Sequence, residues 1–272
     1  MSKRTVIITG ASGSMGSVAV KACAGKGDRV IMACRNLQKA ESVRADIMRS
    51  LPSADIEIAG LDLSSMKSVR AFADSLSSVR IDALFNNAGI INRHFQTTED
   101  GFENTIATNY LGPFLLTSLL LPRMAPDASV VNMVSLTCRF GRVDSALLPG
   151  KHRFSQLGTY SDTKLALLLF SIALSRRNPG LRVNVSDPGI VNSNMISMGR
   201  WFDGLADVFF RPFCKSPESG AAPALGALES GLNLEYFVGN THKPIVDRYL
   251  NHPYLDALWN ETCELLFVSD YF

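Results

Sequence analysis

The chain has 272 residues and a formal net charge of +2, and 46% of its residues are hydrophobic. This composition is typical of a well-packed globular domain and argues against a disordered chain. The near-neutral charge, without any dense block of Lys and Arg, argues against a nucleic-acid partner.

Short β-rich segments alternate with longer helical ones along the chain. In chain order we expect strand Thr5–Thr9, helix Ser14–Lys26, strand Arg29–Cys34, helix Leu37–Ser50, strand Ile56–Leu61, helix Ser65–Leu76, strand Ala83–Asn86, helix Gly101–Met124, strand Ser129–Val134, helix Thr159–Arg177 and strand Arg182–Ser186. Continuous Val- and Ile-rich strands are typical of a sheet buried on both faces. The sequence therefore predicts an α/β fold with a doubly wound parallel sheet, helices on both faces and a single domain over residues 1–272.

The five cysteines are scattered and none stands at CxxC spacing, which indicates reduced thiols and a cytoplasmic protein. The four histidines also lack ligand spacing, so we expect no metal site. The longest apolar run, Leu165–Leu174, is shorter than the ~18 residues that a membrane-spanning helix needs. We expect a buried core helix there and no transmembrane segment.

A glycine-rich turn follows the first predicted strand and opens the first helix. It reads Thr9-Gly10-Ala11-Ser12-Gly13-Ser14-Met15-Gly16. Glycine lets the backbone approach a pyrophosphate closely, and the helix N-terminus offers free N–H groups to it. The turn therefore predicts a dinucleotide site on a Rossmann fold.

The end of the second predicted strand indicates which dinucleotide binds. Enzymes that use NAD place a carboxylate there to hold the ribose 2′-hydroxyl. Here the strand ends in Ala33-Cys34-Arg35-Asn36, and Arg35 can pair with a 2′-phosphate instead. We therefore expect NADP(H).

Tyr160 and Lys164 stand four residues apart in a predicted helix and share one of its faces. An ammonium beside the phenol is expected to lower the pKa of Tyr160, so that it exchanges a proton with a substrate oxygen. Ser135 ends a predicted strand, where its hydroxyl could polarise the same carbonyl.

Together these features resemble the short-chain dehydrogenase/reductase family over nearly the whole chain. The glycine turn, Asn86-Asn87-Ala88-Gly89, Asn109, Ser135, Tyr160-Ser-Asp-Thr-Lys164 and Asp187-Pro188-Gly189 occur in the order found in that family. The resemblance implies that Ser135, Tyr160 and Lys164 form the active site, with Asn109 supporting a proton-relay water. It also implies a small-molecule carbonyl or alcohol substrate and a homo-oligomer.

The cofactor site that these motifs and the resemblance imply draws on several loops. Its expected residues are Gly10, Ser12, Gly13, Ser14, Met15, Gly16, Arg35, Asn36, Asp62, Leu63, Asn87, Ala88, Gly89, Tyr160, Lys164, Pro188, Gly189, Val191 and Ser193.

Two departures refine the resemblance. The Gly10-x-x-Gly13-x-x-Gly16 spacing is more typical of the extended branch, which includes sugar-nucleotide epimerases. The long gap from Ser135 to Tyr160 and the tail Ala257–Leu266 look like the retinol-dehydrogenase-like and protochlorophyllide-reductase-like members.

An aromatic- and methionine-rich segment falls where family members place a substrate lid, about residues 190–215. It favours an apolar substrate, although the same side chains could pack on the core or a partner subunit, or touch a membrane surface. We expect an NADP(H)-dependent oxidoreductase that interconverts a carbonyl and an alcohol by hydride transfer. The alternatives are a non-catalytic NADP(H)-binding sensor or scaffold and an epimerase-type activity.

Overall fold

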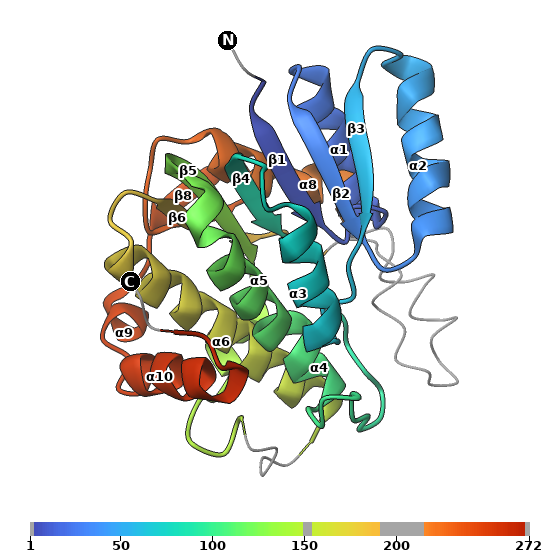
Figure 1. Cartoon of the computed structure of the whole chain (residues 1–272). Helices are drawn as coiled ribbons and strands as arrows, with labels where there is room; N and C mark the ends of the chain where they lie inside the picture. Colours follow the sequence, from blue (N-terminus) through green and yellow to red (C-terminus); the bar gives the residue numbers. More distant parts are fainter. Residues whose placement is uncertain (1–2, 149–153, 191–214, 270–272) are drawn as a thin grey trace, which may run out of the picture.

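The computed structural model describes residues 3–148, 154–190 and 215–269. Within these ranges, eight strands form one sheet in the order β3-β2-β1-β4-β5-β6-β7-β8 (Figure 1). The strands are β1 (Thr5–Thr9), β2 (Arg29–Cys34), β3 (Asp55–Gly60), β4 (Ile81–Asn86), β5 (Met124–Met133), β6 (Arg182–Asp187), β7 (Glu235–Val238) and β8 (Thr241–Pro244). All neighbouring pairs are parallel except β7 and β8, which are antiparallel. The predicted doubly wound sheet is confirmed.

Helices cover both faces of the sheet. The main helices are α1 (Ser14–Gly25), α2 (Leu37–Ser50), α3 (Met66–Ser75), α5 (Gly112–Leu120), α6 (Gln156–Arg177), α8 (Pro217–Glu229) and α10 (Leu255–Leu266). Alternate residues of β1 point to opposite faces: Ile7 packs with α3, α5 and α6, whereas Val6 and Ile8 pack with α1 and α8. The helices thus form two layers that sandwich the sheet.

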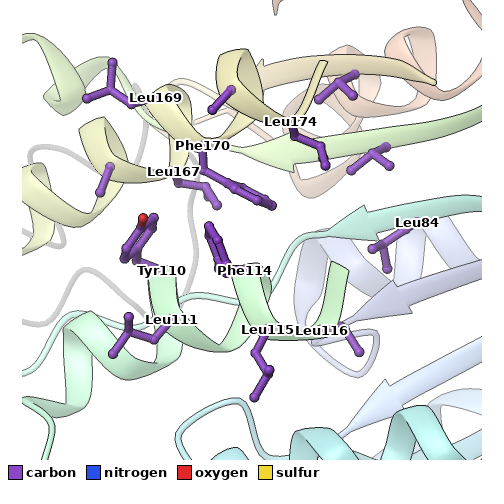
Figure 2. Close-up of a cluster of buried hydrophobic side chains, with 14 of the residues drawn as sticks. Leu84, Tyr110, Leu111, Phe114, Leu115, Leu116, Leu167, Leu169, Phe170 and Leu174 are labelled. Carbon is purple, nitrogen blue, oxygen red and sulfur yellow. The ribbon is translucent and has the colours of Figure 1, made fainter. Parts of the chain in front are cut away.

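Aromatic side chains fill the layer on the α5 and α6 side. Phe114 and Phe170 face each other across α5 and α6 (Figure 2), with ring centroids 4.9 Å apart. Trp259 from α10 packs 5.0 Å from Phe114 and stacks on Phe170. A helix from late in the chain therefore completes the core that the two earlier helices begin.

Helix α6 is long and apolar enough to cross a membrane by length and composition alone. However, 83% of its apolar window is buried inside the protein. The expected core helix around Leu165–Leu174 is therefore confirmed.

The single helix expected over Gly101–Met124 is wrong. The chain instead forms α4 (Asn104–Ile106), a π-helix (Ala107–Leu111), α5 and a 3-10 turn (Leu121–Arg123). Gly101 has a φ of 85°, which no right-handed helix accepts, and the chain enters β5 at Met124. A helical period alone could not reveal these breaks.

The described chain also forms elements that the sequence does not predict. They are η3, a 3-10 helix (Leu136–Phe140), and, after β6, α8, β7, β8, α9 (Asp247–Leu250) and α10.

Candidate active site

The glycine turn between β1 and α1 has the geometry of a phosphate cradle. Gly10 adopts a left-handed φ of 61°, and a Cβ on Gly16 would lie 2.4 Å from the Gly10 carbonyl oxygen. Gly13 is the N-cap of α1 and supplies no side-chain cap. The first N–H groups of α1 are therefore left for another acceptor, and a phosphate is the usual one at such a turn.

This turn borders a cleft of about 540 Å³ at the carboxyl ends of the central strands. Of the expected cofactor residues, those that line the cleft are Gly10, Ser12, Gly13, Ser14, Met15, Gly16, Arg35, Asn36, Asp62, Leu63, Asn87, Ala88 and Gly89. The cleft thus brings together four loops that are far apart in sequence.

Two cations lie where the second strand ends. Arg35 is exposed at the cleft, and Lys39 lines the same wall from the first turn of α2. Asn36 caps that helix by accepting a hydrogen bond from the Lys39 amide at 2.8 Å. Lys39 is not among the cofactor residues expected from the sequence, although an N-cap at Asn36 places it in the first turn of α2, near Arg35.

Asp62 is the only carboxylate among the described residues that line this cleft. It accepts hydrogen bonds from the Ser64 amide at 2.9 Å and hydroxyl at 2.6 Å.

Three expected catalytic side chains converge beside the cleft. Ser135 follows β5 as the N-cap of η3, its Oγ accepts from the Thr137 N–H at 3.3 Å, and its hydroxyl is near enough to Tyr160 to lower the pKa of the phenol. Tyr160 and Lys164 are buried on the first turns of α6. The Lys164 Nζ donates to the Met133 carbonyl at 2.7 Å and lies 5.6 Å from the centre of the Tyr160 ring.

Burial changes the proton chemistry expected of this pair. It raises the pKa of Tyr160 to about 12, against a smaller lowering by Ser135, and it lowers the pKa of Lys164 to about 8. The expected lowering of the Tyr160 pKa is therefore wrong for the protein alone. The reason is that desolvation of the phenol is the largest influence, while the ammonium donates to a backbone carbonyl rather than to the phenol.

Gly89 connects the cleft to these side chains. A Cβ at this position would lie 3.3 Å from the Lys164 Nζ and 3.5 Å from the Asn109 Oδ1. Gly89 therefore leaves the ammonium close to the cleft wall without a side chain pressing on it.

Asn109 lies in the π-helix and is fully buried. Its amide accepts from the Ile90 N–H at 2.8 Å and donates to the Ile90 carbonyl at 2.9 Å and to Thr163 at 3.2 Å. It therefore ties the loop after β4 to α6, and the wider π-turn is a common feature of functional sites.

The remaining expected residues lie at the start of the proposed lid. Pro188 and Gly189 follow β6, where the Gly189 N–H donates to Asp187 at 2.9 Å. Val191, Ser193 and the aromatic segment lie outside the described residues. The Lys215 N–H donates to the Ile190 carbonyl at 2.9 Å, so the two described ends of that segment meet.

Comparison with known proteins agrees with this geometry. Residues 4–200 match the family model described as short chain dehydrogenase. Human retinol dehydrogenase 12 is 34% identical, covering 97% of this chain and 86% of that protein. Human retinol dehydrogenase 13 is 33% identical, covering 97% and 84%.

Solved structures show the same fold. An uncharacterized protein from Mycobacterium paratuberculosis has a TM-score of 0.80 and 31% identity, covering 98% of this chain and 94% of that one. A short chain dehydrogenase from Shigella flexneri, complexed with NADP, has a TM-score of 0.65 and 22% identity, covering 87% and 97%. The chain therefore belongs to the short-chain dehydrogenase/reductase family and is of its retinol-dehydrogenase-like kind.

Proposed function

We propose that this oxidoreductase is an NADP(H)-dependent enzyme that interconverts a carbonyl and an alcohol on an apolar substrate, with Tyr160 as the acid and base. The observation that carries the proposal is the convergence of Ser135, Tyr160 and Lys164 beside the cleft that the glycine turn lines. All the side chains that this chemistry needs are present.

The cleft fits the cofactor. The uncapped start of α1 and the glycine cradle suit a pyrophosphate, and Arg35 and Lys39 suit a 2′-phosphate. Asp62 lines the cleft at the position that matches the family residue in contact with the adenine, so it would lie toward that end of the cofactor. When bound, the nicotinamide would supply or accept the hydride.

In the reducing direction, Ser135 holds the substrate oxygen by a hydrogen bond from its Oγ. Tyr160 gives the phenolic proton to that oxygen as negative charge develops there. A nearby ammonium on Lys164 stabilises the phenolate that remains, and it retains donors beyond the one used on Met133. Asn109 holds the loop at Ile90 against helix α6 by hydrogen bonds, and it thereby helps to position Tyr160 and Lys164 on that helix.

Exposed apolar side chains near the catalytic residues support an apolar substrate. Leu136 and Phe140 follow Ser135, and Leu157 precedes Tyr160 by one helical turn. None of the three lines either described cavity, but large apolar side chains left exposed next to the proposed catalytic residues suit contact with an apolar substrate. The names of the relatives, retinol dehydrogenases, agree with this proposal.

The test is oxidation of NADPH and of NADH, followed by absorbance, against a panel of apolar ketones and aldehydes. We expect NADPH-dependent turnover that is lost in Tyr160→Phe. Equal use of NADH would contradict the cofactor assignment. Clear NADPH binding without turnover would favour a sensor, and retained cofactor without net NADPH consumption would favour an epimerase-type cycle.

We also propose a homo-oligomer in the cytoplasm. Four free cysteines are buried in the described part of the chain, which suits a reducing compartment. Sedimentation velocity tests the assembly, and fractionation of cells that express the protein tests its location. A monomer, or recovery with membranes, would contradict the respective proposal.

A further inference from the structure

A second cavity, of about 610 Å³, lies outside the cofactor cleft, and both buried side chains, here called its floor, and exposed charged side chains, here called its rim, line it. The floor consists of the buried side chains Cys138, Tyr236, Ile245 and Tyr249. These side chains are mostly apolar, with two phenol hydroxyls. The floor therefore suits a hydrocarbon chain that ends in a polar group.

Three cations on separate elements stand at the rim. Arg139 comes from η3, Lys243 from β8 and Arg248 from α9. None of the three forms an ion pair with a carboxylate within the described ranges, and Asp247 is the one described carboxylate that lines the cavity. Lysine is common on edge strands such as β8, so Lys243 alone would indicate nothing. Here two arginines from other elements line the same cavity.

Neighbouring phenols contact two of these cations. Arg248 donates to the Tyr249 hydroxyl, and Lys243 lies 5.7 Å above the centre of the Tyr236 ring. The Tyr236 hydroxyl donates to Asp187 at 2.8 Å, so its proton is already in use. The guanidinium groups therefore remain the donors available to an anion, and their planar shape matches a carboxylate.

One short helix and one carboxylate connect the cavity to the proposed catalytic residues. Cys138 lies in the short helix that Ser135 caps, so one element links the serine to the cavity floor. Asp187 accepts from Tyr236 on the floor and acts electrostatically on Tyr160 and Lys164. A substrate held at Ser135 could thus extend into this cavity.

We propose that Arg139, Lys243 and Arg248 bind the carboxylate of an amphipathic substrate whose carbonyl reacts at Ser135 and Tyr160. This inference rests on the proposed function and narrows its substrate class. The substrate is an apolar aldehyde or ketone with an anionic far end.

The test compares straight-chain aldehydes with ω-oxo acids of the same lengths, which carry a carboxylate at the far end. At the best-fitting length we expect kcat/KM for the acid to exceed that for the aldehyde by about tenfold. The triple variant Arg139→Gln/Lys243→Gln/Arg248→Gln should lose this preference and keep its turnover of the aldehyde.

A matched triple variant, Lys21→Gln/Arg49→Gln/Lys67→Gln, removes the same charge from exposed sites outside both cavities. It should keep the preference for the acid. Equal kcat/KM for acid and aldehyde at every length in the wild type, or equal loss in both triple variants, would overturn the inference. The single variant Lys243→Gln, which should weaken the preference in part, repeats the test with a smaller change.

Direct binding separates this inference from the proposed function. Calorimetric titration with a fatty acid and with its neutral amide needs no turnover. Tighter binding of the acid that disappears only in the cavity triple variant would support the carboxylate site even if no aldehyde were reduced. Equal binding of acid and amide by the wild type would overturn it even if aldehydes were good substrates.

Discussion

Two opposing effects act on the pKa of the buried Lys164 ammonium. Desolvation lowers its pKa to about 8, and the charge of Asp187 raises it back in part. The side chain is 2% exposed, so solvent does little to screen either influence. Its charge is therefore sensitive to pH changes that leave a surface lysine unaffected.

The pH dependence of reduction should show this titration. The ammonium is present below about pH 8 and is lost as the pH rises through that value, whereas the raised pKa of Tyr160, about 12, keeps the phenol protonated. We expect kcat/KM for NADPH-dependent reduction to fall on the alkaline side with an apparent pKa near 8. Asp187→Asn keeps the shape of the side chain but removes its charge, and it should move this limb to lower pH. A profile that stays flat to pH 10 would contradict the role given to Lys164.

Arg35 and Lys39 line the cleft where the proposed 2′-phosphate of NADP(H) would bind. Each charge-assisted contact to a phosphate contributes about 1.5–3 kcal/mol, so Arg35→Gln/Lys39→Gln should weaken NADPH binding about a hundredfold or more. NADH binding should change little. Arg44→Gln, in the same helix but outside the cleft, serves as the control. Equal losses for both cofactors would mean that the two cations do not contact the 2′-phosphate.

At the scale of elements, the turn into α1 depends on a contact that only glycine allows. A Cβ on Gly16 would lie 2.4 Å from the Gly10 carbonyl oxygen and 2.8 Å from the Ala11 Cα. Both neighbours are backbone atoms of the phosphate cradle, and they cannot move aside without reshaping it.

Gly16→Ala should therefore lower NADPH affinity at least tenfold, as measured by fluorescence titration, because the cradle must open. Gly25→Ala is the matched control in the same helix. Its added Cβ would meet only the Leu51 Cδ1 at 3.7 Å, so this variant should bind NADPH normally and be as stable as the wild type or slightly more so. Normal NADPH binding by Gly16→Ala would show that the turn does not hold the pyrophosphate.

The sequence predicts an element well when the residues that define it are close together in the chain. β1, β2 and α2 were predicted to the residue because their apolar runs are bounded by turn or capping residues such as Asn36. The sequence does not predict the π-helix around Asn109. The Asn109 side chain bonds there to Ile90 and Thr163, which lie on other elements, so no local pattern indicates it. The cavity at Arg139, Lys243 and Arg248 was missed for the same reason, since tertiary structure alone brings them together.

At the scale of the whole molecule, the aromatic cluster of α5, α6 and α10 joins the helix that carries Tyr160 and Lys164 to the end of the described chain. Trp259 is 1% exposed and packs against both Phe114 and Phe170. Arg177 lies over its ring at 4.6 Å, which seals the indole at the end of α6.

Trp259→Ala should lower the free energy of unfolding by about 3–5 kcal/mol, because it leaves a large cavity between these helices. Urea titration followed by circular dichroism measures the loss. Phe267→Ala is the control, since Phe267 is 91% exposed and should change stability little. A Trp259→Ala variant as stable as this control would mean that α10 does not brace α6.

The same cluster also bears on the order in which the molecule folds. Phe114, Phe170 and Trp259 come from distant parts of the chain, so closing the loops between them costs entropy before any contact forms. Helical signal should therefore develop earlier in refolding than the change in Trp259 emission. Since Trp259 braces the helix that carries Tyr160 and Lys164, enzymatic activity should return only with that later step.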